Sequence, residues 1–348
     1  MLPLRGCSDV AGRPDRLSTG SRQLRGIIVK PRVLLTLPVS PDVMEEYGTR
    51  VEFIAAPGRS FDEIRQAANG CDAIIVRVPL PEDICEAAPS IRVIARHGAG
   101  LDMIPVKAAT RARVPVVNVP GVNARSVAEH GVMQMLRLAR CERQFGGLTG
   151  QRKWEDARGV AMNATELAGQ TAGIIGMGNV GRTLAEILNT GFGMNILSSG
   201  VRRANWPGYV EDVTLERLLG DSDFVLLCLP LTSTTRGMID AKALDRMKQG
   251  AFLVNLARGG VTVEQDVATA LEKGAIAGAA IDVFERQPLP SDHIFWQIPN
   301  LLISPHVAGM SKTSLSAMGM MSISQSLQVL KGERPPHLVN PEIWEKRR

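Results

Sequence analysis

Three glycines, Gly176, Gly178 and Gly181, constrain the fold more than any other feature of this sequence. They follow an apolar run at 171–175 and precede apolar residues at helical intervals over 184–188. A strand, a tight turn and a helix in this order are the context in which GxGxxG indicates a dinucleotide site. The first glycine permits the turn, the second lets the backbone approach a pyrophosphate, and the third allows close packing of helix and strand. The N–H groups that open the helix then bind the anion.

The end of the next predicted strand indicates which dinucleotide is bound. About twenty residues after the glycines, where an acidic residue would bind the ribose 2′-hydroxyl, residues 196–203 contain no carboxylate. They contain Ser199, Gly200 and the paired Arg202 and Arg203. A guanidinium binds a phosphate through a planar, bidentate fork, so NADP(H) is predicted to be preferred. NAD(H) is the alternative, because paired arginines in a loop often contact only water and would then bind no 2′-phosphate.

Composition sets the broad class. A chain of 348 residues is long enough for two domains with a core each. Its 45% hydrophobic and 22% charged residues are typical of a soluble globular protein, and a net charge of +5 without a basic, aromatic-rich stripe gives no sign of nucleic-acid binding. The five cysteines lack CxxC spacing, so neither a disulfide framework nor a metal site is predicted. No apolar run approaches the ~20 residues that cross a bilayer, and a cytoplasmic location is expected.

Residues 1–26 are rich in Arg, Ser and Gly and lack apolar periodicity. They are predicted to be a disordered leader. A transit peptide is an alternative, since Arg and Ser enrichment is typical of one, but Asp9 and Asp15 count against it. The other alternative is that these residues come from a start codon upstream of the natural one or from an added extension.

From residue 32 onward, short apolar strands alternate with amphipathic helices, the pattern of parallel sheets covered on both faces. Predicted strands are 33–37, 73–76, 91–95, 116–119, 172–175, 195–197, 224–228, 252–255, 279–281 and 301–303; predicted helices are 61–68, 126–140 and 313–331. Most strands are continuous apolar runs, as expected for strands buried on both faces.

The glycine motif lies in the middle of the chain, which suggests that one domain is inserted into another. The sequence therefore predicts an α/β protein with two Rossmann-like, doubly wound parallel-sheet domains. A dinucleotide domain over 126–309 is inserted into a flavodoxin-like domain formed by 27–125 and 310–348, and the last predicted helix returns to that second domain.

Several segments carry a family resemblance over residues 32–344. They are Arg96 to Asp102, Asn118 to Gly121, Ser126 to His130, Leu229 to Thr232, Asn255 to Gly260, Ile281 to Glu285 and Ser304 to Gly309. Together and in this order they resemble the D-isomer-specific 2-hydroxyacid dehydrogenase family, which includes glyoxylate/hydroxypyruvate reductase and D-3-phosphoglycerate dehydrogenase. The resemblance implies an NAD(P)-dependent oxidoreductase that transfers a hydride between the cofactor and a small 2-keto or 2-hydroxy acid. It also makes the flavodoxin-like domain the substrate domain.

The resemblance implies three catalytic residues. His306 is the acid/base, since an imidazole gives a proton in reduction and accepts it in oxidation. Arg258 binds the carboxylate and carbonyl oxygen of the substrate. The glutamate that completes the family's trio is Gln287 here, and Glu285 is expected to point elsewhere. A carboxylate beside histidine raises the imidazole pKa, so we expect reductive activity to fall away at lower pH than in relatives with glutamate.

Other residues are implied to bind substrate or cofactor. The loop with Ala99 and Gly100 offers N–H groups to a carboxylate, and Arg77 adds a charge, although the loop also fits a plain turn. His130, inside a helix, is expected to be a packed interdomain residue, and Met103 replaces the polar residue usual after Asp102. The cofactor contacts are Gly176, Gly178, Asn179, Val180, Gly181, Ser199, Gly200, Arg202, Arg203, Leu229, Pro230, Thr235, Ala257, Asp282 and Gly309.

The sequence leaves four alternatives for the function. Ending shortly after the last predicted helix, the chain resembles glyoxylate/hydroxypyruvate reductase best, with D-3-phosphoglycerate dehydrogenase as the runner-up. The Gln287–His306 pairing also resembles formate dehydrogenase, whose reaction needs no proton transfer to oxygen. Non-enzymatic, nucleotide-sensing co-repressors share the fold and are a fourth alternative. Family members are typically homodimers joined through the cofactor domain, and the helix that starts near Ser126 is expected to contribute.

Overall fold

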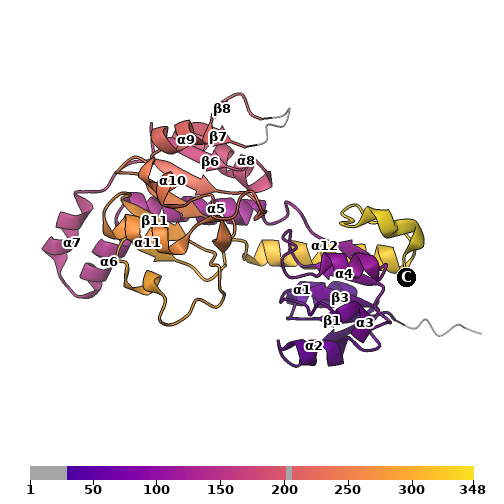
Figure 1. Cartoon of the computed structure of the whole chain (residues 1–348). Coiled ribbons are helices and arrows are strands. Elements are labelled where there is room, and N and C mark those ends of the chain that lie inside the picture. Colours follow the sequence, from indigo (N-terminus) through magenta and orange to yellow (C-terminus); the bar gives the residue numbers. More distant parts are fainter. Residues whose placement is uncertain (1–29, 201–205) are drawn as a thin grey trace, which may run out of the picture. The chain divides into compact units, whose positions relative to one another are not determined.

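The computed structural model describes residues 30–200 and 206–348, and Figure 1 shows their helices and strands. Two parallel sheets account for all of its named strands. The predicted leader, residues 1–26, lies outside the described residues, and so do Arg202 and Arg203. Among the described helices, none is long and apolar enough to cross a membrane.

The first sheet has the strand order β2-β1-β3-β4-β5, which is the flavodoxin-like order. Its strands are β1 (Arg32–Leu35), β2 (Glu52–Ala55), β3 (Ala73–Val76), β4 (Val93–Arg96) and β5 (Val116–Val117). Its helices are α1 (Pro41–Tyr47), α2 (Phe61–Ala68), α3 (Ile84–Ala87), α4 (Val106–Arg111) and, from the far end of the chain, α12 (Lys312–Leu330). The helix α12 packs against β3, β4 and β5, so the last helix does return to this sheet (Figure 1).

The second sheet has the order β12-β11-β10-β9-β6-β7-β8, the Rossmann order with one strand added at an edge. Its strands are β6 (Thr171–Ile175), β7 (Asn195–Ser199), β8 (Val210–Asp212), β9 (Phe224–Leu227), β10 (Phe252–Asn255), β11 (Gly278–Ile281) and β12 (Leu301–Ile303). Its helices are α5 (Ala124–Ala139), α8 (Asn179–Glu186), α9 (Leu215–Asp221), α10 (Ala241–Asp245) and α11 (Glu264–Glu272). Between α5 and β6, α6 (Glu142–Gly150) and α7 (Trp154–Ala161) pack against each other.

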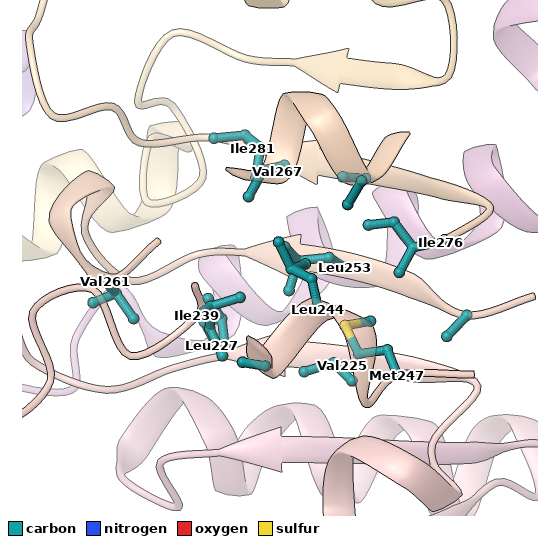
Figure 2. Close-up of a cluster of buried hydrophobic side chains, with 14 of the residues drawn as sticks. Val225, Leu227, Ile239, Leu244, Met247, Leu253, Val261, Val267, Ile276 and Ile281 are labelled. Carbon is teal, nitrogen blue, oxygen red and sulfur yellow. The ribbon is translucent and has the colours of Figure 1, made fainter. Parts of the chain in front are cut away.

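Each sheet separates two hydrophobic clusters, because successive side chains of a strand point to opposite faces. In β9, Val225 and Leu227 join the cluster under α9, α10 and α11, whereas Phe224 and Leu226 join the cluster under α5 and α8. Figure 2 shows the first of these clusters, where Val225 and Leu227 lie among side chains from β10, α10 and α11. In the first sheet, α2, α3 and α4 cover one face, and α1 and α12 cover the other.

The predicted α/β fold with two doubly wound parallel sheets is confirmed. Helix 61–68 and strands 73–76 and 252–255 have the predicted bounds. The sequence analysis missed the edge strands β2 and β8, in which no residue is fully buried, and β8 has Val210 as its one apolar residue. Edge strands depend on one neighbour for their pairing, so their sequences are less constrained by burial.

Candidate active site

The glycine turn between β6 and α8 has the geometry that its spacing predicts. Gly176 has a φ of +101°, and a Cβ there would lie 2.7 Å from the Cys228 carbonyl oxygen. A Cβ at Gly181 would lie 2.2 Å from the carbonyl oxygen of Gly176. At Gly178 a Cβ would meet nothing within 4 Å, so the start of α8 is open on the side where backbone must approach a ligand.

The turn stands where the strand order reverses. β6 pairs with β7 on one side and with β9 on the other, and ligands of open α/β sheets bind outside the carboxyl ends of strands at such a point. At the end of β7, the Ser198 hydroxyl donates to the Ile174 carbonyl oxygen at 2.8 Å, and Gly200 follows with a φ of +147°. The described residues of this strand end, 195–200, contain no carboxylate.

Other expected cofactor contacts lie on the loops around this turn. Thr235 donates its hydroxyl to the Pro230 carbonyl oxygen at 2.8 Å, which closes the loop after β9. A Cβ at Gly121 would lie 2.9 Å from the amide nitrogen of Asn179, and a Cβ at Gly309 would lie 2.7 Å from that of Asn123. Two close approaches of backbone therefore border the start of α8 and the start of α5.

Asp282, directly after β11, holds the loop that carries His306. One carboxylate oxygen accepts from the Ser304 hydroxyl at 2.6 Å and the Val307 N–H at 3.0 Å, and the other accepts from the Ala308 N–H at 2.9 Å. The Asp282 carbonyl oxygen accepts from the His306 N–H at 2.8 Å. This side chain is 2% exposed, so its bonds are formed away from water, where an unpaired carboxylate would be costly.

These bonds hold His306 in an uncommon backbone conformation. Its φ is +56°, in the left-handed region that non-glycine residues rarely adopt. Such conformations persist where the surrounding structure fixes them, and they are found frequently at functional sites. The four bonds from Asp282 to residues 304–308 provide that restraint.

The imidazole of His306 has an amide as its hydrogen-bond partner. Its Nδ1 lies 2.9 Å from Oε1 of Gln287, and Nε2 of Gln287 donates to the Phe284 carbonyl oxygen at 3.2 Å. Since the amide oxygen can only accept, Nδ1 carries the proton and Nε2 of His306 is left for other partners. Glu285 points elsewhere, as expected, because its carboxylate pairs with Arg236 at 3.2 Å.

Burial, followed by the guanidinium of Arg258, lowers the pKa of His306. Arg96 acts in the same direction, and Asp282 and Asp102 oppose the shift without contacting the ring. The neutral imidazole, with a lone pair on Nε2, is therefore favoured at neutral pH.

Arg258, three residues after the end of β10, reaches the loop that follows β4. Its Nε donates to Asp102 at 2.9 Å, and its Nη1 donates to the Ala257 carbonyl oxygen at 2.7 Å. A Cβ at Gly100 would lie 1.9 Å from Nη2 of Arg258, so only glycine lets the guanidinium come this close. The structure thus brings the predicted carboxylate-binding arginine to the predicted carboxylate-binding loop.

A second arginine, Arg96, shapes that loop, and its role was not predicted. Its Nε donates to the Gly100 carbonyl oxygen at 3.0 Å, and its Nη1 donates to Val76 at 2.7 Å and His97 at 3.0 Å. Burial lowers its pKa to about 10, well above neutrality, so it stays charged. The only signal in the sequence was an arginine directly before a glycine-rich loop.

Arg77 and His130 have hydrogen-bond partners other than Arg258 and the ring of His306. The guanidinium of Arg77 donates to the Pro38 carbonyl oxygen, so part of its hydrogen-bonding capacity serves the first sheet's own loops. His130, in α5, was expected to be a packed interdomain residue, and the structure gives its polar partners. Its Nε2 lies 3.1 Å from the Ser304 hydroxyl and 3.8 Å from Asp282, both at strands of the second sheet, because α5 packs on that sheet.

Known proteins with similar sequences and structures identify the family. A model of the D-isomer specific 2-hydroxyacid dehydrogenase NAD-binding domain matches residues 132–308. A glyoxylate reductase of Korarchaeum cryptofilum is 35% identical over 92% of this chain and 98% of its own length. A D-3-phosphoglycerate dehydrogenase of Archaeoglobus fulgidus is 33% identical over 89% of this chain, but only 59% of its own length is covered.

Solved structures agree with these relatives. The TT0316 protein of Thermus thermophilus superposes with a TM-score of 0.82 at 27% identity, over 88% of this chain and 99% of that one. An NADPH-dependent glyoxylate/hydroxypyruvate reductase of Sinorhizobium meliloti, solved with NADP and malonate, gives 0.78 at 26% identity, over 89% and 97%. The chain therefore belongs to the D-isomer-specific 2-hydroxyacid dehydrogenase family of oxidoreductases, which act on CH–OH donors.

Proposed function

We propose that this enzyme is an NADP(H)-dependent reductase of small 2-keto acids, of the glyoxylate/hydroxypyruvate type. The observation that carries the proposal is the pairing of two contacts. Arg258 lies against Gly100, at a loop suited to a carboxylate, and His306 keeps Nε2 free by bonding Gln287 through Nδ1. One group binds the acid and the other handles the proton, which are the two tasks that 2-keto acid reduction sets the protein.

The residues at the glycine turn fit a dinucleotide. Gly178 leaves room for backbone contact with a pyrophosphate, and the unpaired N–H groups at the start of α8 favour an anion. The carboxylate of Asp282 retains acceptor capacity on Oδ2 for the nicotinamide carboxamide. The bound nicotinamide would supply the hydride.

The protein's own groups supply the rest of the reaction. Arg258 and the N–H groups of the loop at Ala99 and Gly100 bind the substrate carboxylate, and Arg258 polarises the carbonyl oxygen. Protonated His306 gives its Nε2 proton to that oxygen during reduction, and neutral His306 removes the hydroxyl proton during oxidation. Gln287 keeps the ring in one orientation through both steps.

The substrate assignment rests on the relatives together with the site. The glyoxylate reductase from Korarchaeum is 35% identical over 92% of this chain, and the D-3-phosphoglycerate dehydrogenase from Archaeoglobus is 33% identical over 89%. A panel of glyoxylate, hydroxypyruvate and 3-phosphohydroxypyruvate, assayed with NADPH and with NADH, tests it. We expect glyoxylate or hydroxypyruvate with NADPH to give the highest kcat/KM. A clear preference for the phosphorylated acid would establish the phosphoglycerate alternative.

The preference for NADPH depends on Arg202 and Arg203, which lie outside the described residues. The absence of a carboxylate at 195–200 supports the preference, because a carboxylate there would repel a 2′-phosphate. The double variant Arg202→Ala/Arg203→Ala should lower the NADPH to NADH ratio of kcat/KM by at least about tenfold, since each charge-assisted bond contributes about 1.5–3 kcal/mol. An unchanged ratio would refute the assignment.

A second candidate is formate oxidation, favoured by the amide beside His306. Turning formate into carbon dioxide needs no proton transfer to oxygen, so a neutral Gln287–His306 pair suffices. Formate turnover with either cofactor, exceeding that of the 2-keto acids, would replace the reductase assignment.

We further propose the assembly and the domain limits. The dinucleotide domain spans 126–309, the substrate domain comprises 27–125 and 310–348, and two copies associate through the dinucleotide domains in the cytoplasm. The large apolar side chains exposed on α5, α7 and the residue after α7 support a partner surface; they are Met133, Leu136, Trp154 and Met162. Light scattering during size exclusion should give twice the chain's 37.5 kDa, and a monomer would refute the dimer.

A further inference from the structure

The segment that carries Gln287 is joined at both ends to a single carboxylate, that of Glu264. Oε1 of Glu264 accepts from the backbone N–H of Glu285 at 2.8 Å. Oε2 lies 3.1 Å from Nε2 of His293, eight residues further along the chain. Glu264 is the first residue of α11, a helix fixed in the core by Val267 and Leu271. The segment 285–293 is thus anchored to a rigid element.

The far anchor, His293, has a defined tautomer. Its Nδ1 accepts from the Phe295 N–H at 3.3 Å, so the ring proton is on Nε2 and is donated to Glu264. The ring also contacts Phe295 edge-on, with centroids 4.7 Å apart. The side chains of His293 and Glu264 are 18% and 15% exposed, so water competes only weakly for their bond.

The near anchor lies beside the amide that touches His306. The Phe284 carbonyl oxygen, which accepts from Gln287 Nε2, belongs to the same peptide group as the Glu285 N–H, which donates to Glu264. The Glu264 carboxylate therefore fixes the peptide group that fixes the Gln287 amide. That amide in turn accepts the Nδ1 proton of His306.

We propose that Glu264 is a positioning residue for His306, acting through both ends of the 285–293 segment. Without its carboxylate, the Glu285 N–H and the His293 ring both lose their acceptor, and Gln287 is no longer held against Nδ1. The imidazole can then exchange tautomers, which puts the proton on the nitrogen that should face the substrate. The proposal rests on the acid/base role proposed for His306.

The test compares Glu264→Ala with Glu272→Ala, an exposed glutamate on the same helix. We expect Glu264→Ala to lower kcat at least about tenfold, with KM for the 2-keto acid changed by less than about twofold, and Glu272→Ala to change neither. Glu264 and Gln287 act in series, so the losses of Glu264→Ala and Gln287→Ala should not multiply in the double variant. Equal behaviour of the two glutamate variants, or losses that multiply, would overturn the proposal.

A measurement that needs no turnover separates this inference from the proposed function. In the cofactor-free protein with ¹⁵N-labelled histidine, His306 should show the Nδ1–H tautomer in the wild type and a mixture in Glu264→Ala. An unchanged tautomer in the variant overturns the positioning role even if the enzyme reduces 2-keto acids well. If instead the wild type turns over no 2-keto acid, the proposed function fails, and the tautomer still decides the role of Glu264.

The variant Glu264→Gln covers the case in which Glu264→Ala does not fold. Its amide oxygen can still accept from Glu285, but its amide group cannot replace both acceptors of the carboxylate. We expect a smaller fall in kcat and a partial change of tautomer. Wild-type values for both in a folded Glu264→Gln protein would overturn the proposal.

Discussion

Two segments hold His306, the strand end at Asp282 and the loop at Gln287, and their chemistry differs. Asp282 is a buried carboxylate whose oxygens bind the hydroxyl and N–H groups of residues 304–308, so it fixes the backbone. Gln287 is a neutral amide that binds the ring itself. The backbone position of the histidine and the orientation of its ring are therefore set by separate groups, whereas its pKa is lowered chiefly by burial and Arg258.

The largest effect is expected from Asp282→Ala. Three donors lose their acceptor in a buried place, and each unsatisfied donor costs about 1–3 kcal/mol. We expect the free energy of unfolding to fall by about 3 kcal/mol in urea titrations. Turnover should fall about 10⁴-fold, because the loop no longer restrains the left-handed conformation of His306. The exposed Asp292→Ala serves as the matched control, and a stable, active Asp282→Ala protein would show that the loop has other restraints.

Unlike Asp282→Ala, His306→Gln is expected to lower activity strongly without lowering stability. The ring makes one hydrogen bond, to Gln287, and most of the loop's restraint comes from its backbone. Turnover should fall about a thousandfold, in the range for general acid–base catalysis. The free energy of unfolding should stay within about 0.5 kcal/mol, the range for substitutions away from buried networks. The same substitution at His337 is the control; a marked loss of stability only at 306 would mean that the ring also supports the fold.

The sequence predicted the two strand series and the glycine turn because both depend on short-range pattern. A Cβ at Gly176 would clash with backbone directly after the adjacent strand, and a Cβ at Gly181 would clash with backbone five residues earlier. The sequence did not predict that Arg96 binds carbonyl oxygens of the loop at 97–100. It also did not predict that Glu264 anchors the 285–293 segment. Glu264 meets Glu285 and His293 across 21 and 29 residues. Nothing in a local pattern shows which of many surface carboxylates makes such a contact.

The sequence also left the role of Asp282 undecided, although this residue was predicted to contact the cofactor. A carboxylate after a buried strand fits both a cofactor contact and a cap, and the sequence does not choose between them. The structure shows the cap, through bonds to Ser304, Val307 and Ala308. Only the fold brings the ends of β11 and β12 together, since these strands are neighbours in the sheet.

The smallest change, Gln287→Glu, alters the ring's proton affinity and leaves the backbone restraint intact. A carboxylate 2.9 Å from Nδ1 would stabilise the imidazolium, so the pKa of His306, now lowered chiefly by burial, should rise. Reduction needs the protonated ring, and its rate therefore falls as pH rises through that pKa. We expect the falling limb of the pH–rate profile to move up by about one unit or more, which corresponds to about 1.4 kcal/mol per unit. Gln151→Glu adds the same charge at an exposed site and should leave the limb in place. A limb that does not move in Gln287→Glu would mean that another group controls the proton, although the loop at Asp282 would still position the histidine.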